Sequence, residues 1–173
     1  MCGILGEHPA TDPRRFQFAL NLLSHRGPDD EGIWQSPENE IMLGHRRLSI
    51  IDLTHAASQP MHSPQYSITY NGEIYNYPEL RADLEKSGYQ FTTQSDTEVL
   101  LNGFHHWGTA LFEKLNGMWA LALWDRKEHQ LFLSRDRFGK KPLFYIHNGD
   151  RFVFASEMKA LVPFLSAVEP NEK

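Results

Sequence analysis

The residue with the clearest chemical potential is the second of the chain. Cys2, in the opening stretch MCGILG, is the only cysteine among 173 residues. Once Met1 is removed, Cys2 carries both a thiol and a free α-amino group, so that a nucleophile and a base for its proton reside on one residue. The alternative interpretation is a small apolar side chain buried in a first strand, as is common for free cysteines.

Attack of a thiolate on an amide also needs hydrogen-bond donors for the oxyanion that develops. Asn71 and Gly72 could supply one side-chain N–H and one backbone N–H. The same Asn-Gly pair is the strongest short signal for a two-residue hairpin turn. An oxyanion turn and a plain hairpin turn are therefore alternative interpretations of this pair.

Two further residues could recognise the charged ends of an amino acid. Arg47 could bind a carboxylate through two parallel hydrogen bonds, and Asp96 could accept hydrogen bonds from an ammonium group. Taken alone, Arg47 also fits a surface ion pair and Asp96 a helix cap. Together with a nucleophilic thiol and an oxyanion site, they describe a site for an α-amino acid with a side-chain amide, and glutamine is the obvious candidate.

The loop HRGPDD carries the next polar group. His25 and Arg26 are interpreted either as support for the surroundings of Cys2 or as part of a turn braced by Asp29 or Asp30. Both interpretations remain open at this point.

Composition narrows the class of protein. The chain is 40% hydrophobic and 23% charged, as in globular proteins, and its length fits one domain over residues 1–173. The formal net charge of −5 disfavours nucleic acid as the main partner. No secretory signal and no run of ~18 apolar residues is present. Since a single cysteine forms no internal disulfide, we expect a cytoplasmic protein.

A metal site is not expected. The chain has nine histidines, but His105 and His106 are adjacent rather than one helical turn apart, and no CxxC or HExxH motif occurs. The basic stretch RFGKKP, residues 137–142, lacks the spacing of a phosphate-binding loop and is interpreted as a turn or an interface.

Helical signals occur in four segments. Residues 12–25 have Asp12 as a cap and Pro13 in the first turn, and residues 76–89 have Pro78 near the start and Gly88 at the end. A third helix is predicted from Asp96, as its cap, toward residue 107. A fourth is predicted over residues 156–161, with Ser156 as its cap.

Strand signals dominate the remainder of the chain. Short apolar runs occupy residues 2–6, 32–34, 41–43, 46–52, 66–70, 73–77, 118–125, 130–136, 142–146 and 151–155. Several of them are apolar on both sides of the pleat, which indicates sheets stacked on each other and also covered by helices. The sequence therefore predicts a layered α+β sandwich.

The ordered motifs are specific as a set. MCGILG, SHRGPDDEG, GHRRLSIIDL, YNGEIYNY, SDTEVLL, LNGMWALALWD, RDRFGKKPLFY and SEMKAL resemble the class II glutamine amidotransferase domain of glutamine-hydrolysing asparagine synthetases. The resemblance extends over nearly the whole chain. It implies the N-terminal-nucleophile hydrolase fold, a four-layer αββα sandwich of two antiparallel sheets.

The resemblance also implies roles for individual residues. It makes Cys2 the nucleophile and places the oxyanion hole at Asn71 and Gly72. It further implies glutamine-binding positions at Arg47, Glu73 and Asp96, and backbone that lines the pocket at Ile50 and Ile51.

The implied reaction is hydrolysis of glutamine to glutamate and ammonia through a glutamyl thioester on Cys2. The ammonia would pass to an ATP-dependent synthetase domain, in cis or in trans, which is absent from this chain and which the RFGKKP stretch is expected to contact. ATP and magnesium are implied for that domain, and no cofactor is expected for this one. A homodimer of the full-length enzyme is a further hypothesis. The competing functions are a glutamine-binding or regulatory module without turnover, and a glutaminase that serves an acceptor other than aspartate.

Overall fold

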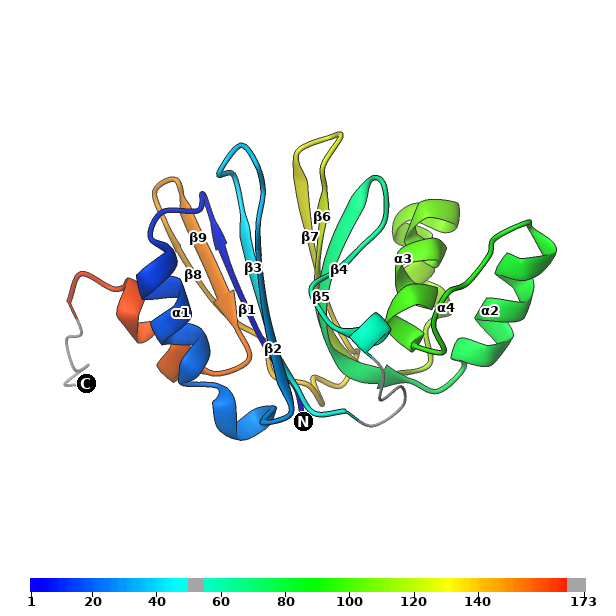
Figure 1. The fold of residues 1–173 in the computed structure, drawn as a ribbon, viewed down its shortest axis with the longest axis horizontal. Helices are drawn as coiled ribbons and strands as arrows, with labels where there is room; N and C mark the ends of the chain where they lie inside the picture. Colours follow the sequence, from blue (N-terminus) through cyan, green and yellow to red (C-terminus); the bar gives the residue numbers. More distant parts are fainter. Residues whose placement is uncertain (50–54, 168–173) are drawn as a thin grey trace.

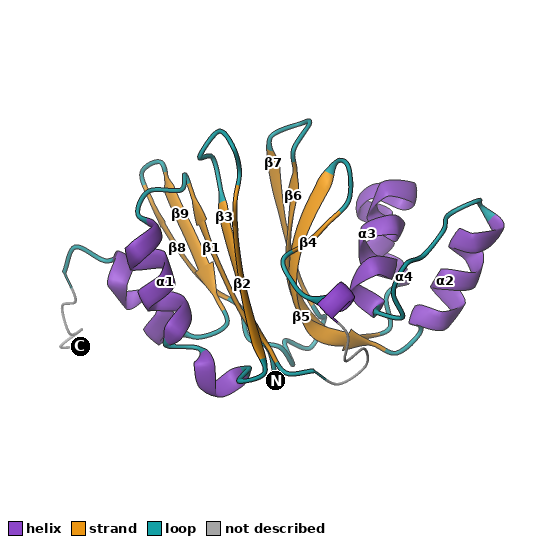
Figure 2. Cartoon of the chain, in the orientation of Figure 1, coloured by secondary structure: helices purple, strands orange, loops and turns teal. Residues whose placement is uncertain are grey.

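The computed structural model describes residues 1–49 and 55–167. Two antiparallel sheets face each other, and helices cover the outer face of each sheet (Figure 1). The expected four-layer α+β sandwich is therefore confirmed. Helices and strands occupy separate layers, as Figure 2 shows.

Each sheet is made of antiparallel neighbours. The first has the spatial order β2 (Asp30–Gln35), β3 (Met42–Arg47), β1 (Gly3–His8), β9 (Arg151–Ala155) and β8 (Phe144–Asn148). The second has the order β4 (Met61–His62), β5 (Tyr66–Ile74), β6 (Gly117–Asp125) and β7 (Gln130–Arg135). The N-terminal strand β1 lies at the centre of its sheet, which fixes the residue before it, Cys2, beside β3.

The outer layers differ in size. Helix α1 (Pro13–Asn21) covers the first sheet, and α2 (Tyr77–Lys86), α3 (Asp96–Trp107) and α4 (Leu111–Lys114) cover the second (Figure 1). The predicted signals for the first two long helices are confirmed: Asp12 accepts hydrogen bonds from the backbone of α1, and Gly88 takes a positive φ of 92° after α2. Short 3₁₀ helices at residues 24–26, 55–57, 108–110, 158–160 and 162–164 complete the described chain.

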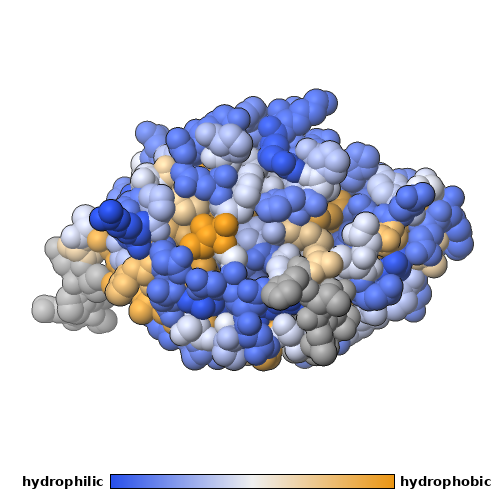
Figure 3. Space-filling view, in the orientation of Figure 1, coloured by the Kyte–Doolittle hydropathy of each residue, from blue (hydrophilic) through white to orange (hydrophobic). Residues whose placement is uncertain are grey.

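Apolar side chains fill both faces of the central strands. One cluster lies between the sheets and consists of Ile4, Ile41, Leu43, Ala120, Ala122, Trp124 and Phe154. Each of the two larger clusters lies between one sheet and the helices that cover it. The view in Figure 3 shows a mainly hydrophilic outer surface with small apolar patches. Burial on both faces explains why the strands are apolar on both sides of the pleat.

Polar side chains also join the sheets near one end of the sandwich. The Thr69 hydroxyl donates a hydrogen bond to the Gly44 carbonyl at 3.0 Å, and the His45 Nε2 lies 3.0 Å from the Tyr70 carbonyl. These two contacts connect β3 to β5. They bring the end of the first sheet that carries Cys2 close to the strand that carries Asn71.

The hairpin prediction at Asn71 and Gly72 was wrong. Strand β5 continues through both residues, which pair with Ala120 and Trp119 of β6. A Cβ atom at Gly72 would lie 2.3 Å from the Met118 carbonyl oxygen. The glycine is therefore required by the close approach of a neighbouring strand and not by a turn.

Two predicted helix caps were also wrong. Ser95, rather than Asp96, caps α3 by accepting a hydrogen bond from the Thr97 amide. Ser156 instead accepts a hydrogen bond from the Ile4 amide at 2.9 Å, and the chain after it forms only 3₁₀ turns. The predicted α-helix over residues 156–161 is therefore replaced by two short 3₁₀ turns, Met158–Ala160 and Val162–Phe164.

Candidate active site

Contacts on two sides hold Cys2. Its Sγ accepts a hydrogen bond from the Leu48 amide at 3.4 Å and lies 3.6 Å from the Leu48 carbonyl. Its carbonyl accepts a hydrogen bond from Arg26 Nε at 2.9 Å, and Arg26 is held in turn by Glu157 at 2.9 Å. The thiol is therefore fixed by the end of β3, and the backbone by a buried guanidinium.

One open pocket gathers the predicted polar residues. It contains about 600 Å³ of empty space, including some that is open to solvent. Six of the predicted residues line it: Cys2, Arg47, Asn71, Gly72, Glu73 and Asp96. The other two, Ile50 and Ile51, lie outside the described residues.

Asn71 presents an unsatisfied donor in this pocket. The residue is 1% exposed, and among the described residues its Nδ2 atom has no hydrogen-bond partner. A buried donor left without a partner costs about 1–3 kcal/mol, so such groups are uncommon in native structures unless they have a role. An N–H donor held beside a thiol could bind the oxygen of a carbonyl under attack.

Arg47 contributes a cation to the pocket from the end of β3. The residue is 7% exposed, and its Nη1 lies 3.5 Å from the Ser58 hydroxyl, which donates to Asp30 at 2.8 Å. This chain of contacts restrains the guanidinium. A restrained arginine can bind a planar carboxylate with two hydrogen bonds.

Asp96 lines the pocket and also makes contacts that support the fold. Its Oδ2 accepts hydrogen bonds from the Tyr70 hydroxyl at 2.8 Å and from the Ile74 amide at 3.1 Å. Burial raises the pKa of the Asp96 carboxyl, and these hydrogen bonds oppose that change. The residue thus joins the start of α3 to β5 while it faces the pocket.

His45 also lines this pocket and was not among the predicted site residues. It is 1% exposed, and burial lowers its pKa to about 4, so the imidazole is neutral near pH 7. Nε2–H therefore donates to the Tyr70 carbonyl, and among the described residues Nδ1 has no partner. The spacing could have revealed His45, because residues two apart on a strand share a face and His45 precedes Arg47 by two.

The two residues of the HRGPDD loop differ in their contacts. Arg26 contacts Cys2 directly, whereas His25 contacts Glu157 at 2.9 Å and its side chain is 52% exposed. Burial raises the pKa of Glu157, but hydrogen bonds from Arg26, His25 and Lys159 outweigh this effect and lower that pKa to about 2. Asp29 accepts a hydrogen bond from the Ser49 amide at 2.8 Å and thereby braces the same loop. Both predicted roles of the loop are therefore present: Arg26 supports the backbone of Cys2, and Asp29 braces the turn.

Two kinds of feature are absent from the part of the chain that the structure describes. Within the described ranges, no group of three or more His, Cys, Asp or Glu side chains could hold a metal ion. None of the helices in those ranges is long and apolar enough to cross a membrane.

Known proteins match both the sequence and the fold. Residues 1–172 match the family model described as a glutamine amidotransferase domain, and the chain therefore belongs to that family. The arrangement of sheets and helices is the N-terminal-nucleophile hydrolase fold. The sequence-based expectation of family and fold is thus confirmed.

Two named relatives make the similarity to known proteins more specific. Asparagine synthetase (glutamine-hydrolyzing) 3 of Bacillus subtilis (strain 168) is 40% identical over 171 residues, which cover 94% of this chain and 27% of the relative. Asparagine synthetase (glutamine-hydrolyzing) 1 of the same organism is 42% identical over 182 residues, which cover 100% of this chain and 28% of the relative. The chain thus spans about a quarter of the length of these relatives.

A solved structure supports the fold alone. Glutamine phosphoribosylpyrophosphate amidotransferase from B. subtilis matches with a TM-score of 0.80 at 24% sequence identity, over 93% of this chain and 43% of that one.

Proposed function

We propose that this domain hydrolyses the side-chain amide of glutamine to glutamate and ammonia through a glutamyl thioester on Cys2. The observation that carries the proposal is Asn71 Nδ2, which has no partner among the described residues and is buried in the pocket that contains the Cys2 thiol. A donor held ready for an oxygen is what acyl transfer to a thiol requires. Family membership supports the same reaction.

The proposed steps use groups of this chain and one water molecule. With Met1 removed, the α-amino group of Cys2 takes the thiol proton, and Sγ attacks the amide carbon. The oxyanion accepts hydrogen bonds from Asn71 Nδ2 and the Gly72 amide. The C–N bond then breaks, and ammonia leaves with the proton held by the amine. Water attacks the thioester, releases glutamate and restores the thiol.

Recognition of glutamine is assigned to the charged residues of the pocket. Arg47 binds the α-carboxylate, and the carboxylates of Glu73 and Asp96 face the α-ammonium. Backbone at Ile50 and Ile51 completes the binding site in this proposal. The opposite charges within one pocket match the opposite charges at the two α-substituents of an amino acid.

The ammonia acceptor lies beyond this chain. We propose an ATP-dependent synthetase domain that uses ammonia to make asparagine, and the names and greater length of the relatives support this assignment. ATP and magnesium belong to that domain. Phe138 of the RFGKKP stretch is 87% exposed and offers an apolar contact for it. The free thiol that the reaction needs favours a reducing compartment, and we place the enzyme in the cytoplasm.

The test compares two preparations that differ only at the N-terminus. One begins at Cys2 and the other retains Met1, with each verified by mass spectrometry. Ammonia release from glutamine is expected only from the form that begins at Cys2, and Cys2→Ala in that form is expected to abolish it while the protein stays folded. Equal rates in the two preparations contradict the amine-base mechanism. Absence of turnover from both, with glutamine still bound, supports a regulatory module instead.

The pH dependence provides a second readout of the same proposal. If the α-amino group is the base, kcat/KM rises with pH through a midpoint within about a unit of ~7.7–8.0, the range of free α-amino groups. A pH-independent rate between pH 6.5 and 9 contradicts this role for the amine.

A further inference from the structure

Tyr70 is a buried residue of the pocket that the proposed reaction does not use. It is 3% exposed and directly precedes Asn71 on β5. Its hydroxyl donates a hydrogen bond to Asp96 Oδ2 at 2.8 Å, and both residues line the pocket that contains Cys2. A buried tyrosine hydroxyl usually has a hydrogen-bond partner. In this protein the partner is the carboxylate that is assigned to the substrate ammonium.

The backbone and the ring of Tyr70 are held from several sides. The Tyr70 amide donates a hydrogen bond to Gln59 Oε1 at 2.7 Å, and the Tyr70 carbonyl accepts one from His45 Nε2 at 3.0 Å. Gly72, two residues along β5, leaves room for the ring, because a Cβ atom there would lie 2.6 Å from Tyr70 Cε2. The ring also belongs to the apolar cluster between the second sheet and its helices. These contacts give the Tyr70 hydroxyl a defined position.

Two hydrogen bonds reach the same oxygen of the Asp96 carboxylate. Oδ2 accepts one from the Tyr70 hydroxyl and one from the Ile74 amide, at 2.8 Å and 3.1 Å. Tyr70 and Ile74 belong to β5, and Asp96 is the first residue of α3. The two bonds therefore fix the carboxylate relative to the strand that carries the oxyanion donors. A carboxylate held through Oδ2 can present Oδ1 to an ammonium group in the pocket.

The hydroxyl also favours the charged form of the carboxylate. Burial raises the pKa of the Asp96 carboxyl, whereas the hydrogen bonds from Ile74 and Tyr70 lower it. Burial and the charge of Asp96 raise the pKa of Tyr70 well above its ordinary value, so the hydroxyl keeps its proton and acts as the donor. Only the ionised carboxylate attracts an ammonium group by its charge.

We propose that Tyr70 is a positioning residue of the glutamine site, whose hydroxyl orients the Asp96 carboxylate toward the α-ammonium group of the substrate. The proposal rests on the proposed role of Asp96 in glutamine binding. The ammonium group takes no part in the reaction of the side-chain amide, so its contact with Asp96 is the same in the ground state and in the transition state. Loss of the Tyr70 hydroxyl therefore weakens substrate binding more than it slows the chemistry.

The test compares two ligands that differ only in the α-ammonium group. Glutamine carries this group, and glutaramate has a hydrogen atom in its place. Their affinities are measured by isothermal titration calorimetry in a protein that begins at residue 2 and carries Cys2→Ala, so that no turnover occurs. In the added Tyr70→Phe variant, the Kd of glutamine is expected to rise about 10-fold, the effect of one hydrogen bond to a charged group. The Kd of glutaramate is expected to stay unchanged.

Tyr89→Phe is the matched control. The Tyr89 hydroxyl lies 2.7 Å from His105 Nδ1 in the last turn of α3, whereas the Tyr70 hydroxyl contacts the first residue of the same helix. Tyr89→Phe is expected to leave both affinities unchanged. An unchanged glutamine Kd in Tyr70→Phe overturns the proposal. An equal loss of affinity for glutaramate also overturns it, because that result indicates a general loosening of the pocket.

Steady-state kinetics provide a second readout in the protein that retains Cys2. Tyr70→Phe is expected to raise KM about 10-fold and to keep kcat within a few-fold of the parent. A fall in kcat with unchanged KM overturns the proposal. A protein that binds glutamine without releasing ammonia contradicts the proposed function, and the calorimetric comparison still decides the role of Tyr70.

A measurement on the protein with its native Tyr70 covers the case in which Tyr70→Phe fails to fold. Proton NMR follows the hydroxyl proton of Tyr70, which the buried hydrogen bond to Asp96 protects from exchange with water. Saturation with glutamine is expected to move this resonance, because the ammonium polarises the same carboxylate. Glutaramate is expected to move it less. No movement with bound glutamine, or an equal movement with both ligands, overturns the proposal.

Discussion

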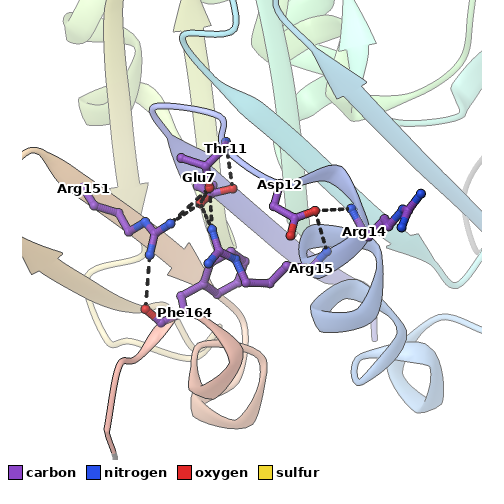
Figure 4. A network of polar contacts seen from close by, with 7 residues as sticks. All are labelled: Glu7, Thr11, Asp12, Arg14, Arg15, Arg151 and Phe164. Atoms are coloured by element: carbon purple, nitrogen blue, oxygen red, sulfur yellow. Dashed lines mark hydrogen bonds and ion pairs between the residues drawn. The ribbon is translucent and has the colours of Figure 1, made fainter.

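Two buried polar clusters lie on opposite faces of strand β1 and differ in how well their groups are paired. On the face toward α1, the fully buried carboxylate of Glu7 accepts hydrogen bonds from Thr11 Oγ1 at 2.6 Å and from Arg15 at 3.3 Å, and it forms an ion pair with Arg151 at 3.3 Å (Figure 4). Arg151 also donates to the Phe164 carbonyl. We call these side chains the Glu7 cluster: Glu7, Thr11, Arg15 and Arg151.

On the face toward the second sheet, the pocket contains groups that lack partners. Asn71 Nδ2 and His45 Nδ1 are unpaired among the described residues, as is Arg15 Nε in the Glu7 cluster. The Glu7 carboxylate itself has partners on both oxygens. Breaking a pair of buried charges destabilises the folded chain, whereas unpaired donors and acceptors around a cavity are available to a ligand. One face of β1 therefore contributes stability, and the other is suited to binding a ligand.

Removal of the Asn71 Nδ2 donor tests whether the pocket face of β1 serves activity rather than stability. Asn71→Ala is expected to lower kcat by about 10²–10³ with little change in KM, because an oxyanion donor acts mainly in the transition state. The free energy of unfolding is expected to change little, since Nδ2 makes no hydrogen bond to a described residue. Asn148→Ala, at an exposed position of β8, is the control. A rise in KM with unchanged kcat contradicts the assignment of Asn71.

The opposite outcome is expected for the Glu7 cluster. Glu7→Gln leaves two arginines facing a neutral group and is expected to lower the free energy of unfolding by about 3 kcal/mol, measured by urea denaturation. The kcat/KM of the folded fraction is expected to stay near that of the parent, because Glu7 faces away from the pocket. Glu128→Gln, whose ion pair with Lys127 is exposed, is expected to change stability by less than about 0.5 kcal/mol. Loss of kcat/KM in folded Glu7→Gln would remove the distinction between the two faces.

Adjacent arginines on β3 allow a matched test of glutamine binding. Arg47→Ala is expected to raise KM about 10²-fold with kcat within a few-fold of the parent, because its bonds to a carboxylate form in both ground and transition states. Arg46 pairs with Glu31 at 2.6 Å and contacts Asn21 of α1, so Arg46→Ala is expected to leave KM unchanged. Similar KM values for the two variants would show that Arg47 does not bind the substrate carboxylate.

The smallest expected effect concerns the pH dependence of stability. The folded pKa of His45 is about 4 and its ordinary value is 6.5, so between these values the unfolded chain binds a proton that the folded chain does not. Stability therefore falls as the pH decreases from 6.5 toward 4, and this residue alone contributes a loss of about 2 kcal/mol at pH 5 relative to pH 7.5. In His45→Gln, urea denaturation is expected to show a correspondingly smaller loss between these two pH values. An equal loss in both proteins would contradict the effect of burial on His45.

Local patterns predicted much of the secondary structure and of the site. Asp12 and Gly88 mark helix boundaries because capping and positive φ depend on neighbouring residues. Asn71-Gly72 failed as a hairpin signal because its backbone pairs with β6, more than forty residues away, and that pairing outweighs the local preference. His45 was missed because its significance comes from burial, which depends on elements distant in sequence.

The sequence by itself determined which chemical groups are present: one cysteine near the start, an Asn-Gly pair, an arginine in a predicted strand and an aspartate at the start of a predicted helix. Only the tertiary structure decided that these groups share one pocket, because β1 and β3 of one sheet meet β5 of the other across an apolar layer. The same packing left Asn71 Nδ2 without a partner among the described residues. Burial changes the cost of charge and of unpaired donors, and burial is a property of the folded chain.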